Sequence, residues 1–197
     1  LLVFGELWEG RMGLYTVNVQ TGATALTASI PDRRMRLAVW SPDGTAIYTR
    51  SATTLIGRVD PAMGQETELH RAGGPAFGLD VSPDGRWLAF FQGENSLVVM
   101  PSAGGDPHAV AYLDEDEVND GLRHVFVRWT PDGEHVLFPK RQKELWQVNV
   151  DTGAQQQIGT VPGDLVNAAM HPDGRQIALT VQQGGSALWV MENFLPE

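Results

Sequence analysis

The chain has 197 residues, a formal net charge of −10 and no cysteine, so disulfides and thiolate metal sites are excluded. The acidic balance argues against nucleic acid as a main partner, because binding to phosphates needs a dense Lys and Arg face. With 22 Gly, 12 Pro and a charged fraction of 19%, the composition favours many short strands joined by tight turns, and no apolar run approaches the ~20 residues of a membrane span.

Predicted strands follow one another in a repeating order along the chain. The opening segment, LLVFGELWEGRMGLYTVNVQTGATALTAS at residues 1–29, matches the second, third and fourth strands of a four-strand unit. A complete unit then runs through MRLAVW, TAIYTR, TLIGRVD and ETELHRA, and two more units begin at AFGLDV and HVFVRW. The last unit has LVNAAM, RQIALT and SALWVM but lacks a fourth strand.

The tripeptide PDG joins the first and second strands of each unit that has both. Its proline recurs at spacings of 41, 48 and 41 residues, at Pro42, Pro83, Pro131 and Pro172. Pro presets φ at about −65°, Asp can bond its own backbone, and Gly accepts a positive φ. The Ser or Thr before the Pro can cap the turn, and His171 takes that place in the last unit. We therefore predict that these residues are structural hairpin connectors.

Four antiparallel strands in about 40 residues, repeated, predict a β-propeller. The expected fold class is all-β, a single domain of four-stranded antiparallel blades, with about four and a half to five blades in this chain. The expected divisions are a partial blade at 1–34, blades at 35–75, 76–123 and 124–164, and a partial blade at 165–197.

Tryptophans recur beside the PDG turns and in the strands that follow them. Trp40 and Trp129 stand two residues before their prolines and are expected to pack between blades. Trp87, Trp146 and Trp189 lie in second and third strands, and we interpret them as core residues for the same reason.

Two of the repeats, WSPDGTAIYT at Trp40–Thr49 and VSPDGRWLAF at Val81–Phe90, carry the clearest form of the unit. They resemble the WD-repeat-like propeller repeats of the TolB type, and the resemblance covers nearly the whole chain. It implies a propeller and an extracytoplasmic bacterial setting. The ending SALWVMENFLPE also resembles the closing segment of propellers in bacterial signalling proteins, which would make this chain the sensor or binding part of a larger bacterial protein.

The two end units do not obviously complete one blade. The first lacks its inner strand and the last lacks its outer strand, so the leftover strands come from opposite edges. Either further blades precede this chain or several copies form a larger ring, since an open array leaves unpaired edges and bare apolar faces. A homo-oligomer that completes the ring is one expected outcome.

The segment LDEDEVNDGLR, Leu113–Arg123, is the most distinctive stretch and accounts for the longer spacing of 48. Its oxygen donors make Ca²⁺ conceivable, but their spacing misses the EF-hand loop, and no cofactor is the main expectation. Partner recognition and a solvated charge run are the other interpretations. The weak metal candidates are Asp114, Asp116 and Asp120. The candidates for contact with a partner are Glu115 and Glu117.

Polar residues near the start of the inner strands are expected to line the mouth of the central channel and to contact a partner. These candidates are Arg36, Asp80, His124, Arg128 and Asn167. Asp80 and Arg128 hold equivalent positions in successive blades, three residues before the Pro, and we expect them to form an ion pair between the blades.

Motifs of enzymatic chemistry are absent from the sequence, including GxSxG, the P-loop, GxGxxG and HExxH. We therefore interpret the chain as a non-enzymatic propeller scaffold for a protein or peptide partner. Two alternatives stay open. The chain is either the propeller part of a hydrolase, peptidase or metal-assisted enzyme, or a propeller fragment that self-assembles into a ring.

Overall fold

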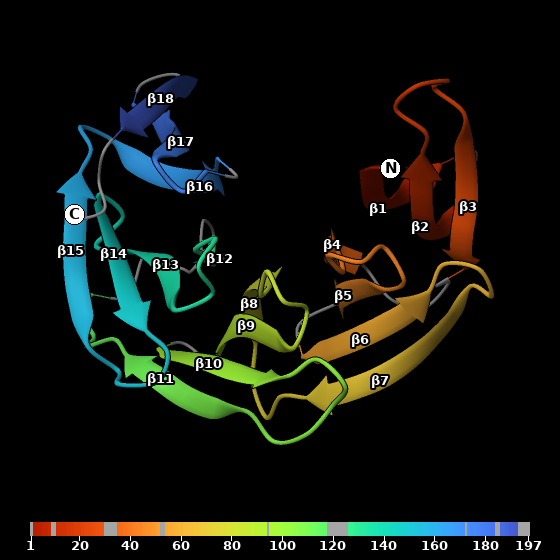
Figure 1. Cartoon of the computed structure of the whole chain (residues 1–197), viewed down its shortest axis with the longest axis horizontal. Coiled ribbons are helices and arrows are strands. Elements are labelled where there is room, and N and C mark those ends of the chain that lie inside the picture. The colour runs from red at the N-terminus through yellow and green to blue at the C-terminus, as the bar shows by residue number, and fades with distance from the viewer. Residues whose placement is uncertain are drawn as a thin grey trace.

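The computed structural model describes residues 2–8, 11–29, 35–51, 54–93, 95–117, 126–171, 173–183 and 186–192. In these ranges it has 18 strands and no helix, arranged as five separate antiparallel sheets. Figure 1 shows the sheets following one another in chain order around an arc. The predicted all-β propeller of four-stranded antiparallel blades is confirmed. Among the described residues no helix has the length and apolar character needed to cross a membrane.

Each sheet is one blade, and its strands pair in the order of the sequence. The first blade contains β1 (Leu2–Trp8), β2 (Arg11–Val17) and β3 (Thr24–Ser29). The second contains β4 (Met35–Trp40), β5 (Ile47–Ser51), β6 (Leu55–Asp60) and β7 (Gln65–Arg71). The third contains β8 (Ala76–Val81), β9 (Trp87–Gln92), β10 (Ser96–Pro101) and β11 (His108–Tyr112). The fourth contains β12 (Arg128–Trp129), β13 (His135–Lys140), β14 (Glu144–Asn149) and β15 (Gln155–Thr160). The fifth contains β16 (Asp164–Met170), β17 (Gln176–Gln182) and β18 (Ser186–Glu192).

Hydrogen bonds within each PDG turn hold the hairpin between the first and second strands of its blade. In the third blade, the Ser82 hydroxyl donates to Asp84 Oδ1 (2.6 Å) and accepts from the Trp87 N–H (2.9 Å). Asp84 Oδ1 also accepts from the Arg86 N–H (3.0 Å), and Gly85 takes a φ of 74°. The Gly85 N–H donates to the Ser82 carbonyl at 2.8 Å, so backbone and side-chain oxygens together accept the N–H groups of the reversal.

Other blades repeat this turn, which confirms its structural role. Ser41 and Asp43 make the corresponding 2.6 Å bond in the second blade, and Thr130 and Asp132 make it at 2.5 Å in the fourth. In the fifth blade the imidazole Nδ1 of His171 lies 2.8 Å from Asp173 Oδ1, where the other turns have the hydroxyl–carboxylate bond. A ring nitrogen can therefore replace the hydroxyl as the partner of the turn aspartate.

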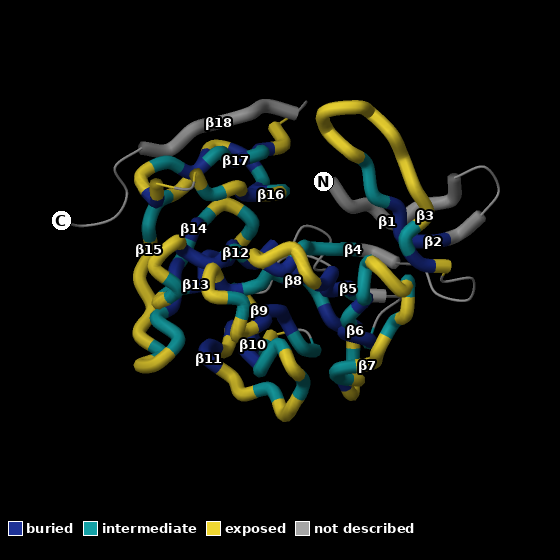
Figure 2. Tube along the Cα trace, turned by 45° about the vertical axis from the view of Figure 1, so that its right-hand side comes forward, coloured by how far each residue is buried: buried dark blue, intermediate teal, exposed yellow. Residues whose placement is uncertain are grey.

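The hydrophobic core lies between successive blades. One cluster joins the third and fourth blades through side chains such as Phe91, Val99, Trp129 and Phe138, all at most 5% exposed. Figure 2 shows burial concentrated on the inner and middle strands, with exposed residues on turns and outer strands. Because each blade buries its faces against its neighbours, the rigid unit is a pair of blades, and a site between two blades has fixed walls.

Inner strands succeed one another around the centre of the arc, with contacts from β1 to β4, β4 to β8, β8 to β12 and β12 to β16. Figure 1 shows the first and fifth blades on either side of an opening. Within the described residues, the sheets of these two end blades share no hydrogen-bonded strand pair.

Candidate functional site: an aromatic cleft between two blades

The predicted channel residues of the inner strands bond to the next blade. The Asp80 carboxylate on β8 accepts from the backbone N–H of Trp129 on β12 at 2.8 Å. Arg128 on β12 reaches β16, where Nε donates to the Ala168 carbonyl (2.8 Å) and a terminal nitrogen donates to Asn167 Oδ1 (2.9 Å). These three candidates therefore fasten one inner strand to the next around the arc.

The ion pair expected between Asp80 and Arg128 does not form, because each side chain bonds to a following strand instead. Their charges still interact. Burial raises the pKa of the Asp80 carboxyl, while the Arg128 charge and the Trp129 N–H oppose this rise. The expectation failed because Asp80 accepts from the Trp129 N–H while Arg128 donates to Ala168 and Asn167 of β16, so the two side chains are not each other's partners.

Two further channel candidates lie outside the described side chains. Arg36 belongs to β4, whose backbone is described, but its side chain is not. His124 lies outside the described residues. Contact of either residue with a partner stays a prediction.

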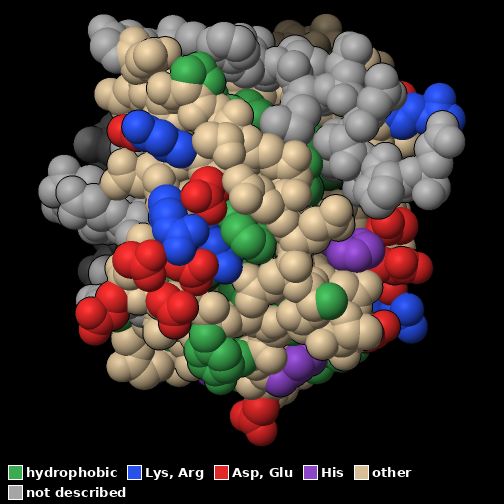
Figure 3. Space-filling model, turned by 90° about the vertical axis from the view of Figure 1, so that its left-hand side faces the viewer, with side chains coloured by type: hydrophobic (Ala, Val, Ile, Leu, Met, Phe, Trp, Pro, Cys, Tyr) green, Lys and Arg blue, Asp and Glu red, His purple; other side chains and the backbone are tan. Residues whose placement is uncertain are grey.

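Cations of the fourth blade form ion pairs with the acidic segment. Glu117 pairs with Lys140 Nζ at 3.0 Å, and the side chains of these two residues are only 13% and 5% exposed. Arg141 pairs with Asp116 at 2.9 Å and also with Glu144 at 3.2 Å. Figure 3 shows acidic and basic side chains intermixed on one side of the molecule. We call Asp116, Glu117, Lys140, Arg141 and Glu144 the charge cluster.

Backbone and ring contacts complete the charge cluster. The Arg141 N–H donates to the Glu117 carbonyl at 3.1 Å, and the Lys140 ammonium lies 4.3 Å from the centre of the Trp146 ring. The hairpin that carries these cations takes positive φ at Arg141 (48°) and Gln142 (63°), a conformation that non-glycine residues rarely adopt.

The carboxylates of the charge cluster are held in the ionised form. Burial alone would raise the pKa of Glu117. Hydrogen bonds from the Asp114 N–H and from Lys140, with the charges of Lys140 and Arg141, outweigh this effect and lower the pKa. A hydrogen bond from Arg141 lowers the pKa of Asp116 and raises that of Arg141 itself.

The remaining acids of the segment divide between two groups. Asp114 and Glu115 are exposed, and the Asp114 N–H donates to a Glu117 oxygen at 3.1 Å. Asp120 lies outside the described residues. Binding of Ca²⁺ by Asp114 and Asp116 therefore stays a prediction, and Asp116 would have to exchange Arg141 for the ion.

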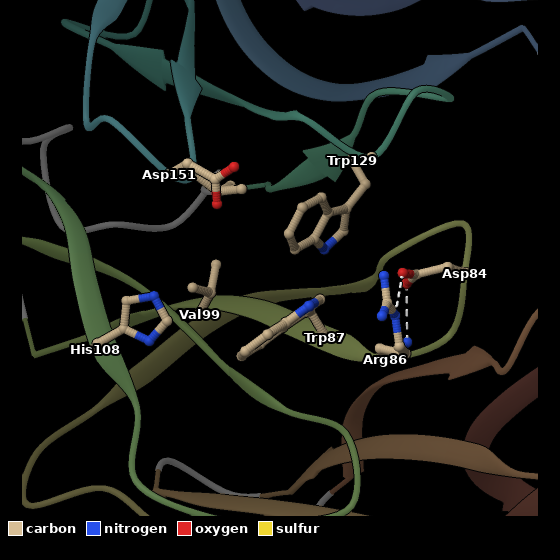
Figure 4. Close-up of a pocket in the computed structure, with 9 residues that line it drawn as sticks. Asp84, Arg86, Trp87, Val99, His108, Trp129 and Asp151 are labelled. Atoms are coloured by element: carbon tan, nitrogen blue, oxygen red, sulfur yellow. Dashed lines mark hydrogen bonds and ion pairs between the residues drawn. The ribbon is translucent and has the colours of Figure 1, made fainter.

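A cleft of about 240 Å³ opens between the third and fourth blades, at the end that carries the PDG turns. Trp87, the first residue of β9, and Trp129, the last of β12, form its two aromatic walls, and Figure 4 shows both rings bordering the same space. Val99 and Val150 add apolar surface. We call this space the aromatic cleft. Trp87 is 36% exposed, so its interpretation as a core residue is wrong.

The indole nitrogen of Trp129 is the unusual atom of the aromatic cleft. Trp129 is 5% exposed, and its Nε1 is buried without a hydrogen-bond partner within the described ranges. Figure 4 shows this nitrogen on the side of the ring that faces Trp87. A buried Trp usually finds an acceptor for its N–H, and a donor left alone costs free energy.

Charged residues stand at the rim of the aromatic cleft. The Arg86 guanidinium pairs with the Asp84 carboxylate at 2.6 Å. A hydrogen bond from the Ser82 hydroxyl is the main cause that lowers the pKa of Asp84 to about 2, so this acid stays ionised. On the opposite side lie His108, whose ring meets that of Trp87 edge-on at 6.0 Å, and the exposed carboxylate of Asp151.

The pair of tryptophans is specific to this blade boundary. At the boundary of the second and third blades, the equivalent residues are Ala46 and Val81. At the boundary of the fourth and fifth blades, they are His135 and Met170. In the sequence, the two tryptophans stand beside successive PDG turns. Only the order of the blades brings them to the same cleft.

No family model matches the sequence. An uncharacterized protein of Agrobacterium fabrum is 26% identical over 140 residues, which cover 70% of this chain and 46% of that protein. The chain thus spans less than half the length of the curated relative it matches.

Solved structures with a similar fold cover more of this chain than the sequence relative does. A putative TolB from Agrobacterium tumefaciens matches 92% of this chain and 66% of its own length, with a TM-score of 0.70 and 19% identity. TolB from Acinetobacter baumannii matches 92% of this chain and 46% of its own, with a TM-score of 0.74 and 17% identity. The chain has a TolB-type propeller fold. An oligogalacturonate lyase in complex with manganese also matches, over 98% of this chain and 71% of its own, with a TM-score of 0.60 and 13% identity.

Proposed function

We propose that this propeller is a non-enzymatic interaction module that takes a protein or peptide partner at the aromatic cleft. One observation carries the proposal: Trp129 lines the cleft, and its buried N–H has no acceptor among the residues that the structure describes. A partner that supplies an acceptor removes the cost of this unsatisfied donor. Trp87 adds an exposed indole ring, and tryptophans are enriched among the residues that dominate binding energy.

The charged candidates elsewhere support a binding role over a catalytic one. Asp80, Arg128 and Asn167 bond to neighbouring blades, and in the charge cluster Lys140 pairs with Glu117 while Arg141 pairs with Asp116 and Glu144. Catalysis needs a base or acid positioned to reach a substrate. Asp80 and Arg128, the titratable residues among these described inner-strand candidates, therefore connect neighbouring blades.

Selection from a random peptide library displayed on phage tests this proposal, with counter-selection on the Trp87→Ala variant. Trp87 is exposed, so the variant is expected to fold. We expect enriched peptides that bind the original chain and lose binding to the variant. Peptides that bind both proteins equally, or a library from which nothing is enriched, would contradict the proposed function.

An enzymatic alternative is favoured by the likeness to oligogalacturonate lyase, but that likeness shows the fold alone. The direct test is incubation of the chain with oligogalacturonate and Mn²⁺, followed by ultraviolet absorbance of the unsaturated product. We expect no product above the rate without protein. Formation of product that depends on the metal would contradict the binding proposal and would identify a lyase activity instead.

We further propose an extracytoplasmic bacterial setting, which the TolB resemblance and the bacterial origin of the two TolB structures support. Cell fractionation tests it, and recovery with cytosolic markers would contradict it. A ring of several copies stays a prediction. Light scattering tests it, because a ring requires a mass that is a multiple of 21.5 kDa.

A further inference from the structure

The aromatic cleft has a shape and a polarity that together restrict what it can hold. We propose that it binds an extended, proline-containing peptide segment followed by a basic residue. A backbone carbonyl of this segment accepts from Trp129 Nε1, a proline ring packs on Trp87, and the basic side chain pairs with Asp151. The inference rests on the proposed function and names its ligand class.

The Trp129 N–H requires an acceptor. Indole nitrogen donates and never accepts, so neither a hydroxyl hydrogen nor an ammonium group can satisfy it. Peptide carbonyls are strong acceptors, and in the polyproline II conformation they all point outward without internal hydrogen bonds. An extended peptide can therefore present an oxygen to Trp129 without losing a bond of its own.

Aromatic and apolar walls favour proline at the same place. The cleft is lined by Trp87, Trp129, Val99 and Val150, and these walls offer no acceptor for a backbone N–H. Proline has no N–H, so its burial there leaves no donor unsatisfied. Pro-rich segments also lose little conformational entropy on docking into aromatic grooves. A volume of about 240 Å³ suits one or two residues rather than a large cofactor.

Charge at the rim favours a basic neighbour. Arg86 and Asp84 satisfy one another, and Ser82 also bonds to Asp84. Asp151 is exposed at the far side of the cleft, and in the described part of the chain only its backbone N–H takes part in a bond, with Asn149. Its carboxylate is therefore the rim charge available to a ligand, on a chain whose net charge is −10. A Lys or Arg beside the proline provides the complement.

A sugar fits this site less well. Several hydroxyl donors would enter a space whose acceptors are the rim carboxylates, and Asp84 already accepts three hydrogen bonds. Asp151 is the remaining rim carboxylate, and one carboxylate cannot accept from all the hydroxyls of a hexose, so some would be buried without partners, which costs free energy. Carbohydrate binding is treated as an outcome of the experiment below.

The experiment follows the indole N–H resonances of the ¹⁵N-labelled chain, which has six tryptophans. The probe is a synthetic oligoproline peptide with arginines at its C-terminus. We expect the indole resonances of Trp129 and Trp87 to shift on titration, the first being the one that is absent in Trp129→Phe and the second the one that is absent in Trp87→Ala. We also expect Trp87→Ala to weaken binding at least about tenfold. Trp40→Phe is the matched control, because it removes an unpartnered indole N–H from the equivalent position of another blade and should leave affinity unchanged.

Variant peptides separate the parts of the proposal. Glutamates in place of the arginines should weaken binding to the original chain, and Asp151→Asn should reduce the difference between the two peptides. A glycine–serine peptide that shifts the Trp129 resonance equally would overturn the role of proline. A shift with maltotriose but none with the peptides would overturn the inference in favour of a carbohydrate.

The same data distinguish this inference from the proposed function. If phage selection yields peptides that need Trp87 but contain no proline, the ligand class is wrong and the interaction module stands. If neither the selected peptides nor the oligoproline probe need Trp87, both proposals fail.

Discussion

The charge cluster and the aromatic cleft are two contacts of the same fourth blade that differ in how their polar groups are satisfied. In the charge cluster, Glu117 meets Lys140 at 3.0 Å and Trp146 Nε1 donates to Glu144 at 2.8 Å. In the aromatic cleft, Trp129 Nε1 meets nothing in the described part of the chain. A satisfied network stabilises a fold, whereas an unsatisfied buried donor beside a cleft is a feature that a ligand can complete.

The sequence favours the acidic segment as a binding site, whereas the structure favours the aromatic cleft. An acidic run in a long connection is typical of a binding loop, and a tryptophan beside a turn is typical of a core. In the structure, Asp116 and Glu117 hold the connection to the next blade, and Trp87 is exposed. Charge in a sequence therefore gives little information about function until its partners are known.

The largest expected effect comes from breaking the charge cluster at Lys140. Lys140→Met leaves the mostly buried Glu117 carboxylate without its closest cation, and we expect a loss of about 2–3 kcal/mol in the free energy of unfolding. Urea denaturation measures it. Lys143→Met, at an exposed position nearby, is the control and should change stability by less than about 0.5 kcal/mol. Equal effects of the two substitutions would mean that the cluster is only a solvated charge run.

Acidification sharpens this test. The folded-state pKa of Glu117 is lowered, so its pairing contributes stability above the ordinary pKa of 4.5, and this contribution is lost as the pH falls through the lowered value. The stability difference between the original chain and Lys140→Met should therefore shrink as the pH falls from neutral to below 4.5. A difference that is constant with pH would assign the loss to packing on Trp146 instead.

A smaller effect is expected at the inner strands. Arg128→Met removes the bonds to Ala168 and Asn167, and we expect a loss of about 1–2 kcal/mol at neutral pH. It also removes the charge that restrains the raised pKa of Asp80. An acid whose folded-state pKa is raised disfavours folding above its unfolded pKa, and this cost is relieved as the pH falls.

The loss from Arg128→Met should therefore be smaller at mildly acidic pH than at neutral pH, in urea denaturation of both proteins. Arg175→Met, an exposed arginine of the fifth blade, is the control. A loss that grows on acidification would show that the Arg128 charge does not act on Asp80.

Much of the fold could be predicted from the sequence because the blade is encoded locally. A PDG turn needs only Ser82, Asp84 and Gly85 at fixed spacing, and the alternating strands beside it follow from their periodicity. Four copies of one pattern also predict the order of the sheets. These are short-range properties that a single sequence displays.

The aromatic cleft could not be predicted in the same way, because its walls come from different blades. Trp87 and Trp129 are 42 residues apart, and their meeting depends on how far one blade turns relative to the next. The hairpin at Arg141 and Gln142 was also beyond the sequence, since non-glycine residues at positive φ carry no turn motif. Long-range packing decides both features, and local pattern is silent about it.

The smallest expected effect compares two tryptophans directly. Trp146→Phe removes an indole N–H that donates to Glu144, and should cost about 1 kcal/mol more than Trp129→Phe, whose N–H has no bond to lose. Thermal and urea unfolding of both variants measure the difference. Trp129→Phe itself should change stability by less than about 1 kcal/mol, because an unsatisfied donor is removed while an aromatic ring is kept. If Trp129→Phe is the more damaging of the two, its nitrogen already has a partner within the folded chain. The aromatic cleft would then be as complete as the charge cluster, and a ligand would have nothing to add there.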